Sequence, residues 1–169
     1  MAKTTVIGID PGSQHTGFGV VSYEHGRFNL ECSGVIHTKV DGADFSNRLI
    51  KIYHELVTVI QRTAPQEAAI EEVFVSKNPQ SALKLGQARG VAVAACAAYG
   101  LPVFDYAATK VKSAIVGHGR AAKEQVAFVV KQLLKIKEAD WALDTSDALG
   151  LAICHLTLRN SPFTAQNKS

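Results

Sequence analysis

An aspartate between two closely spaced apolar segments is the feature that most constrains the fold. In the stretch VIGIDPGSQHTGFGVV, the apolar run 6–9 ends at Asp10, a Pro-Gly pair follows, and a second apolar run occupies 18–21. This pattern predicts a β-hairpin, because β-branched residues favour strands and Pro-Gly pairs break them. An ionised carboxylate is expensive to bury without a partner. We therefore expect Asp10, at the end of a buried strand, to face either water or a cation.

The remaining periodicity predicts an α/β protein. Apolar residues at helical spacing alternate with short β-branched runs over most of the chain, after three strands in meander order. The predicted strands are 4–10, 17–23, 28–38, 68–73 and 101–106, and the predicted helices are 45–63, 81–99, the basic helices of 108–137, and 144–159. Such an order favours a mixed five-stranded sheet flanked by helices on both faces. We expect one domain over 1–160 and a flexible tail over 161–169.

Length and composition exclude several classes of protein. The chain has 169 residues, of which 47% are hydrophobic, as expected for one ordinary globular domain. Its longest apolar run, 91–98, is too short to span a membrane, and the N-terminus lacks a secretory pattern. Cys32, Cys96 and Cys154 lie far apart without a CxxC pair, which argues against disulfides and zinc. These features predict a cytoplasmic protein.

Positive charge is concentrated in one segment. The net charge is only +3, but the segment 109–137 contains a single acid, Glu124. Its basic residues are Lys110, Lys112, Arg120, Lys123, Lys131, Lys135 and Lys137. One basic surface on a nearly neutral protein is typical of nucleic-acid binding. A solvated helix surface explains the lysines equally well.

Four further acidic residues lie within or at the start of apolar elements. Glu71 and Glu72 lie in the predicted strand AAIEEVFV, and strand alternation places one of them on each face without choosing between them. Asp144 and Asp147 are three residues apart, so they share one side of the last helix. Each has an ordinary explanation, such as exposure to water for a glutamate, or helix capping and the helix dipole for the aspartates.

The acids together point to chemistry that none of them indicates alone. Four carboxylates would each begin or end an element that packs into one core. Oxygen ligands of this kind suit Mg²⁺ or Mn²⁺ rather than zinc. Two such ions about 4 Å apart can stabilise the attacking and leaving oxygens of a phosphodiester during hydrolysis.

Several motifs together resemble one known family. GIDPG with TGFGVV, AIEEVF with SALKLGQARGVA, and DTSDALGLAICH resemble the RuvC family of Holliday junction resolvases, in its order and spacing, over residues 4–157. The resemblance implies an RNase H-like fold and a homodimer that cuts four-way DNA junctions with two Mg²⁺ ions per subunit. It also implies metal binding and catalysis by Asp10, Glu71, Asp144 and Asp147. Glu71 is thereby chosen over Glu72.

The same resemblance implies residues that contact DNA. Phe74 matches an aromatic residue placed against unstacked bases at the junction centre, although a core phenylalanine fits the pattern equally well. Lys112 and Lys123 match basic residues near the scissile phosphate, and we count Lys123 among the catalytic residues. The complete expected DNA-binding set is Phe74, Lys77, Lys84, Arg89, Lys112, Arg120 and Lys123.

The sequence departs from the family pattern at one position, and the resemblance implies three partners. Gln14 stands where family members often carry a basic residue, and the neighbouring His15 could replace that phosphate contact. The implied partners are four-way junction DNA, a second copy of the chain, and the branch-migration complex of RuvA and RuvB. The alanine-rich helix 81–99, which includes Ala94, is either the dimer interface or part of the monomer core.

Other functions remain open at this stage. DPGxxxTGFG also resembles the phosphate-binding hairpin of actin-like ATPases, but those proteins need two such domains and this chain has room for one. A non-catalytic nucleic-acid binder would have little reason to keep four carboxylates that repel DNA. The nearest alternative is a nuclease of the same fold that cuts RNA–DNA hybrids and reads ribose 2′-hydroxyls.

Overall fold

A central sheet and five helices make up the computed structural model of this chain. It describes residues 2–38, 44–73, 78–136 and 143–160, with the backbone alone at 143 and 144. The strands are β1 (Thr4–Asp10), β2 (His15–Glu24), β3 (Arg27–His37), β4 (Glu67–Glu71) and β5 (Val103–Tyr106). The helices are α1 (Phe45–Thr63), α2 (Pro79–Ala98), α3 (Ala108–Val116), α4 (Lys123–Leu133) and α5 (Leu143–Arg159).

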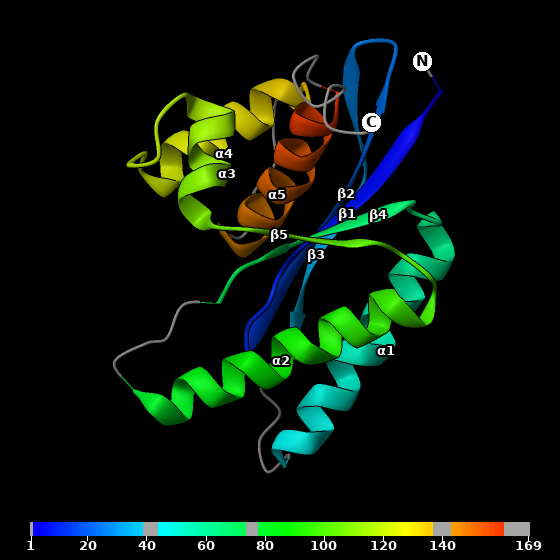
Figure 1. Cartoon of the computed structure of the whole chain (residues 1–169), viewed down its shortest axis with the longest axis vertical. Helices are drawn as coiled ribbons and strands as arrows, with labels where there is room; N and C mark the ends of the chain where they lie inside the picture. The colour runs from blue at the N-terminus through cyan, green and yellow to red at the C-terminus, as the bar shows by residue number, and fades with distance from the viewer. Residues whose placement is uncertain (1, 39–43, 74–77, 137–142, 161–169) are drawn as a thin grey trace, which may run out of the picture.

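The sheet is mixed, as the sequence predicts. Its strand order is β3-β2-β1-β4-β5, and the three N-terminal strands form an antiparallel meander. β4 and β5 then run parallel to β1, so the carboxyl ends of all three strands lie at one edge of the sheet (Figure 1). In open sheets with parallel strands this edge is the usual place for ligands. The start of β2 and the end of β3 lie at the same edge.

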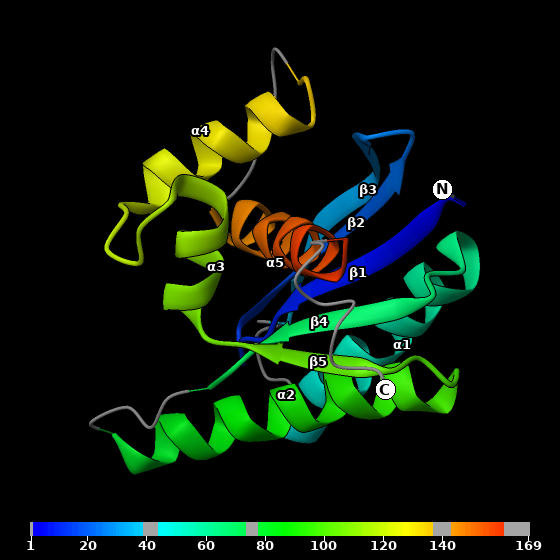
Figure 2. The same ribbon diagram turned by 45° about the horizontal axis from the view of Figure 1, so that its top comes forward.

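Two helical layers cover the two faces of the sheet. Figure 2 shows α1 and α2 on one side and α3, α4 and α5 on the other. Alternation along β1 divides the core, because Ile7 and Ile9 pack with α1 and α2, whereas Val6 packs with the layer of α5. On α5 the apolar side chains of Leu149, Ala152, Ile153 and Leu156 are buried. The prediction of helices on both faces is confirmed.

Element boundaries differ only slightly from the predicted ones. The basic segment forms two helices, α3 and α4, because Gly117 adopts a left-handed conformation with φ 91° and ends α3. The second predicted helix begins two residues early, at Pro79, where Asn78 caps it through hydrogen bonds from the amides of Gln80 and Ser81. None of the described helices is long and apolar enough to cross a membrane.

Candidate active site

Asp10 and Glu71 end two neighbouring parallel strands. Ile9 pairs with Ile70 in the register of β1 and β4, so the next residue on each strand, Asp10 and Glu71, stands beside the other at the carboxyl edge. Strand alternation places Asp10 on the same face as Gly8, which contacts α5. Glu71 shares a face with Ala69, which belongs to the α5 side of the core. Both carboxylates therefore belong to the face that α5 covers.

Two glycines bring the first turns of α5 onto the sheet. A Cβ at Gly8 would lie 2.0 Å from the carbonyl oxygen of Ala148, and one at Gly19 would lie 2.6 Å from Cδ2 of Leu149. Gly8 and Gly19 are cross-strand partners on β1 and β2, so together they form one shallow depression under the helix. Because no side chain separates the backbones there, Asp147, the residue before Ala148, is held close to the strand ends.

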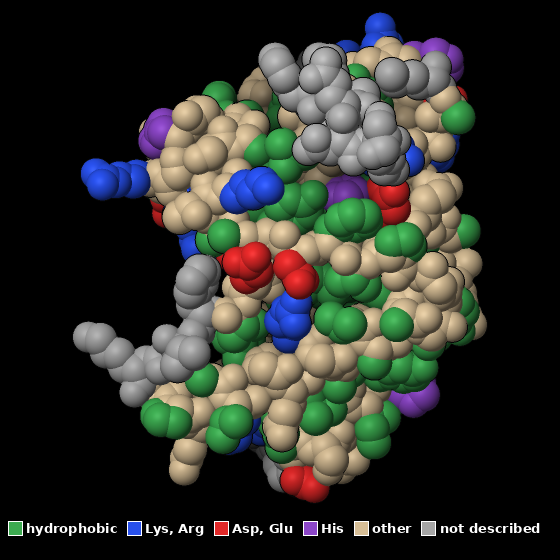
Figure 3. Space-filling view, viewed as in Figure 1, with side chains coloured by type: hydrophobic (Ala, Val, Ile, Leu, Met, Phe, Trp, Pro, Cys, Tyr) green, Lys and Arg blue, Asp and Glu red, His purple; other side chains and the backbone are tan. Residues whose placement is uncertain are grey.

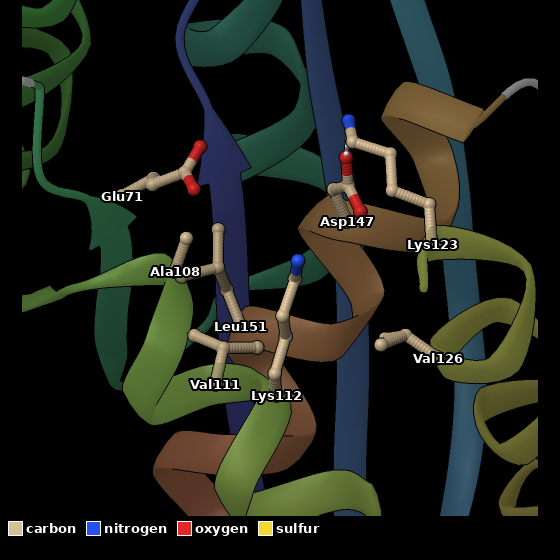
Figure 4. A pocket seen from close by; sticks show the side chains of 8 residues that line it. All are labelled: Glu71, Ala108, Val111, Lys112, Lys123, Val126, Asp147 and Leu151. Carbon is tan, nitrogen blue, oxygen red and sulfur yellow. Dashed lines mark hydrogen bonds and ion pairs between the residues drawn. The ribbon is translucent and has the colours of Figure 1, made fainter. Parts of the chain in front are cut away.

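A small pocket lies between the strand ends and helices α3, α4 and α5. Its volume is about 110 Å³, and it is lined by Glu71, Ala108, Val111, Lys112, Lys123, Val126, Asp147 and Leu151. Figure 4 shows the charged groups of Glu71, Lys112, Lys123 and Asp147 directed toward a common space above apolar side chains. Four elements, β4, α3, α4 and α5, thus each supply at least one charged group to one pocket.

Lys123 and Asp147 form the ion pair of this pocket. The Nζ atom of Lys123 donates a hydrogen bond to Oδ2 of Asp147 at 2.7 Å, and the side chains are 53% and 24% exposed. Lys123 is the first residue of α4, where the positive end of the helix dipole disfavours a cation. Because Asp147 offsets this repulsion, the lysine is held at the pocket.

Glu71 and Glu72 occupy different environments. Glu71 is half-buried and lines the pocket, whereas the side chain of Glu72 is exposed and takes no part in the pocket lining. The amide of Glu72 donates to the carbonyl oxygen of Tyr106 at 3.0 Å, which ties the end of β4 to β5. The structure therefore separates two neighbours that strand alternation left equivalent in the sequence.

The donor atoms of this site fit a hard divalent cation. Asp10, Glu71 and Asp147 offer only carboxylate oxygens, the ligands that Mg²⁺ and Mn²⁺ prefer. Among the described side chains, no three His, Cys, Asp or Glu residues lie close enough together to hold a metal ion. The backbone of Asp144 is in the first turn of α5, but its side chain is outside the description. Metal binding by these four acids therefore stays a prediction.

A hydrogen-bonded network of four side chains joins α5 to β4 and β5. Tyr106, the partner of Glu71 in the register of β4 and β5, shares a hydrogen bond of 2.7 Å with Nδ1 of the buried His155. The other ring nitrogen of His155 lies 2.7 Å from Oε2 of Glu67 at the start of β4. Arg159 completes the network, with Nε 3.1 Å from the same oxygen. This network fixes α5 against β4 and β5.

The other predicted DNA-binding residues lie in several places. Lys112 lines the pocket, and Arg120 is exposed in the turn between α3 and α4. Lys84 is exposed on α2, with Nζ 5.7 Å from the centre of the Phe45 ring. Arg89, also on α2, pairs with Asp105 through a contact of 2.5 Å. Phe74 and Lys77 lie outside the described residues.

The pocket at the carboxyl edge carries both signs of charge. Figure 3 shows acidic side chains near the middle of the viewed face, with lysine and arginine side chains above and below them. A phosphate backbone can approach such an edge, because the flanking cations reduce its repulsion by the acids. This arrangement is compatible with the predicted nucleic-acid substrate.

The sequence analysis did not predict the roles of Gly8 and Gly19 or the hydrogen-bonded network around His155. A glycine inside a strand signals a close backbone approach, so Gly8 and Gly19 carried a readable signal in GID and GFG. Tyr106 and His155 carried none, because they are 49 residues apart and meet only through the fold. His155 is buried, and both of its ring nitrogens have hydrogen-bond partners.

Comparison with known proteins gives one consistent result. A family model described as crossover junction endodeoxyribonuclease RuvC matches residues 6–155. A protein of that name from Lawsonia intracellularis is 54% identical over 92% of this chain and 91% of its own length. Its counterpart from Oleidesulfovibrio alaskensis is 56% identical over 92% of each chain. The structure of Thermus thermophilus RuvC in complex with a Holliday junction substrate superposes with a TM-score of 0.86 at 34% identity, covering 92% of this chain and 94% of that one.

Proposed function

This chain belongs to the RuvC family of crossover junction endodeoxyribonucleases, and from that membership we propose how its own residues cut four-way (Holliday) DNA junctions. The family consists of metal-dependent nucleases that hydrolyse DNA phosphodiester bonds, and the resemblance seen in the sequence is confirmed. The single observation that carries the residue assignment is the pocket at the carboxyl edge, where Glu71 and Asp147 meet Lys112 and Lys123. The scissile phosphate would bind at this pocket.

We propose that Asp10, Glu71, Asp144 and Asp147 hold two Mg²⁺ ions at this edge. The oxygen-only donors and the adjacent ends of β1 and β4 support this assignment. Bound Mg²⁺ supplies positive charge for the phosphodiester oxygens and lowers the pKa of coordinated water. The four acids are the catalytic and metal-binding residues of the proposal.

The two lysines of the pocket would position the phosphate. In the free protein Lys123 is occupied by Asp147, and an incoming phosphate would compete for its ammonium group. Lys112 lies on α3 and is half-buried at the same pocket. Cations placed in advance at a transferring phosphoryl group stabilise the charge that develops in the transition state. Lys123 is therefore the catalytic lysine of the proposal.

The proposed active form is a homodimer. A four-way junction is resolved only when two strands are cut at symmetric positions, so one active site per chain calls for two chains related by a two-fold axis. The surface of α2 supports this. Leu83 is 68% exposed there, and positions for a Cβ at Gly86 and Gly90 contact nothing within 4 Å. Ala94 is exposed on the same helix, so a second chain could approach its backbone closely.

The two sides of α2 differ in burial, and this difference supports a part in both of the roles that the sequence left open. Ala88, Ala92, Ala95 and Cys96 are buried in the monomer core, whereas Gly86, Gly90, Ala94 and Ala97 are exposed. One side of the helix thus serves the core and the other is available for association. The proposal also includes cooperation with the branch-migration complex of RuvA and RuvB, which rests on family membership alone.

A substrate comparison tests the proposed function. The protein is incubated with Mg²⁺ and three end-labelled substrates of matched length: a four-way junction, a linear DNA duplex and an RNA–DNA hybrid. We expect paired, symmetric cuts in the junction and none in the other two. Cleavage of the hybrid would favour the alternative nuclease of the same fold. Cleavage of the linear duplex at a comparable rate would contradict junction selectivity.

A further inference from the structure

Two histidines meet at the same edge of the sheet as the acids. His15, the first residue of β2, is the cross-strand partner of His37, the last residue of β3. Asp10 pairs with Gly17, only two residues along β2 from His15. Because successive side chains alternate, His15 is on the same face of the sheet as Gly17 and Gly19, the face that α5 covers. The pair therefore flanks the proposed active site.

The two imidazole rings face each other through their Nδ1 atoms. Their Nδ1 atoms are 3.0 Å apart, and the ring planes are inclined at 79°. One ring must donate this hydrogen bond and the other must accept it, so two nitrogens share one proton. Two nitrogens bound to a zinc-like ion at about 2.0–2.1 Å lie about 2.9–3.4 Å apart for angles between about 90° and 110°. The observed separation matches that spacing.

The backbone holds both histidines in place. Thr16 and Thr38, which directly follow them, are 0% and 1% exposed. The hydroxyl of Thr16 donates to the carbonyl oxygen of Gly12 at 2.9 Å, and that of Thr38 donates to the carbonyl oxygen of Ser13 at 2.9 Å. The turn between β1 and β2 is thus fixed against β3. Since both rings are exposed, an ion between them could complete its coordination with water or with a phosphate oxygen.

We propose that His15 and His37 form a second metal site, selective for a divalent transition ion such as Zn²⁺, Ni²⁺ or Cu²⁺ and separate from the acidic site. Imidazole nitrogens suit these ions, whereas Mg²⁺ prefers oxygen. For both Nδ1 atoms to bind the ion, the donating ring moves its proton to the exposed Nε2, so no net proton is released at neutral pH. The bound ion would add positive charge at the same edge of the sheet as the proposed active site.

Calorimetric titration with Ni²⁺ tests the site, on untagged protein and with excess Mg²⁺ to occupy the carboxylates. We expect His15→Gln and His37→Gln each to weaken Ni²⁺ binding at least about tenfold, since loss of even an indirect ligand partner costs this much. Both side chains are exposed, so neither change should affect folding. His54→Gln, which removes an exposed histidine from α1, is the matched control and should leave the affinity unchanged.

Electron paramagnetic resonance of bound Cu²⁺ identifies the ligands directly. The site predicts hyperfine coupling to two imidazole nitrogens in the parent protein and to one in His37→Gln. Equal Ni²⁺ affinity in the parent protein and in the His15→Gln, His37→Gln double variant would overturn the proposal, as would coupling to a single nitrogen in the parent. Neither readout depends on nuclease activity, so the proposed cleavage function stands or falls separately.

Discussion

The two helical layers pack on one sheet but approach it in different ways. On one face α5 lies directly on the backbone of the sheet, because Gly8 and Gly19 leave no side chain between them. On the other face α2 buries alanines toward the core and turns Gly86 and Gly90 to the outside, where nothing contacts them. Glycine therefore has opposite uses in the two layers. In one layer it brings α5 onto the sheet, and in the other it leaves an open surface where we propose that a second chain binds.

The largest effect should come from adding a methyl group at Gly8, where α5 meets the sheet, and the same change on α2 is its control. Gly8→Ala would place a Cβ 2.0 Å from the carbonyl oxygen of Ala148, and neither backbone can move without displacing α5. We expect a loss of about 3 kcal/mol or more in the free energy of unfolding, measured in urea, because the site is overpacked. Gly86→Ala is the control. It should not lower stability, since its Cβ meets open space and alanine favours helices. Equal effects would remove the contrast between the layers.

A charge on the outer surface of α2 should dissociate the dimer. Ala94 is exposed in the monomer, so Ala94→Glu should fold normally and sediment as a monomer that nicks one strand of a junction. Repulsion between two carboxylates at a symmetric interface, together with the cost of burying them, accounts for the dissociation. Thr58→Glu, an exposed change on α1, should leave the dimer intact. A dimeric Ala94→Glu protein would place the interface elsewhere, and an unfolded one would place Ala94 in the core.

Removing single lysines from the layer of α3, α4 and α5 should distinguish residues needed for cleavage from residues needed for DNA binding. Lys123→Ala removes the partner of Asp147 and a cation from the pocket. We expect cleavage to slow about 100-fold, as when one preorganised electrostatic contact is lost. Lys135→Ala, beyond the end of α4, should mainly weaken binding and flatten the log–log salt dependence by about one unit. An unchanged rate in Lys123→Ala would remove this lysine from the catalytic residues.

The smallest effect concerns Tyr106 in the hydrogen-bonded network around His155. Burial raises the pKa of Tyr106 to about 12, so the folded protein holds this proton more tightly than the unfolded chain does. The resulting stability is complete below about pH 10 and is lost as pH rises toward 12. Tyr106→Phe should cost about 1 kcal/mol at neutral pH by removing a partner of His155.

Urea unfolding at neutral and alkaline pH checks both parts of this prediction. The difference in stability between the parent protein and Tyr106→Phe should shrink as pH rises above about 10. A difference that stays constant with pH would mean that the tyrosine proton does not contribute to stability. Cleavage of junctions by Tyr106→Phe at neutral pH should remain close to normal, because the hydroxyl lies beneath the site and does not line the pocket.

Most of the fold was predictable because its signals are local. Turn residues such as Pro11 and Gly12, strand alternation and helical periodicity each act over a few residues, and they locate every element within a few positions. The family motifs added the choice of Glu71, which alternation could not make. The structure then shows why the two glutamates differ, since only the first one lines a pocket formed by α3, α4 and α5.

The rest depends on contacts between distant parts of the chain. His155 reaches Glu67 across 88 positions, and no spacing rule connects two residues so far apart. The division of α2 into a buried and an exposed side likewise requires knowing which side meets the sheet. The pairing of His15 with His37 depends on the register of β2 and β3, which the sequence leaves open.

The central claim is that the carboxyl edge under α5 carries out the reaction, and two adjacent glutamates test it most directly. Glu71→Gln and Glu72→Gln make the same chemical change one residue apart, inside and outside the pocket. Single-turnover cleavage of a labelled junction in Mg²⁺ is measured for both, together with junction binding. We predict no detectable cleavage by Glu71→Gln, with binding retained or tightened as repulsion of phosphate falls, and parental cleavage by Glu72→Gln. An active Glu71→Gln protein beside an inactive Glu72→Gln protein would contradict the assignment.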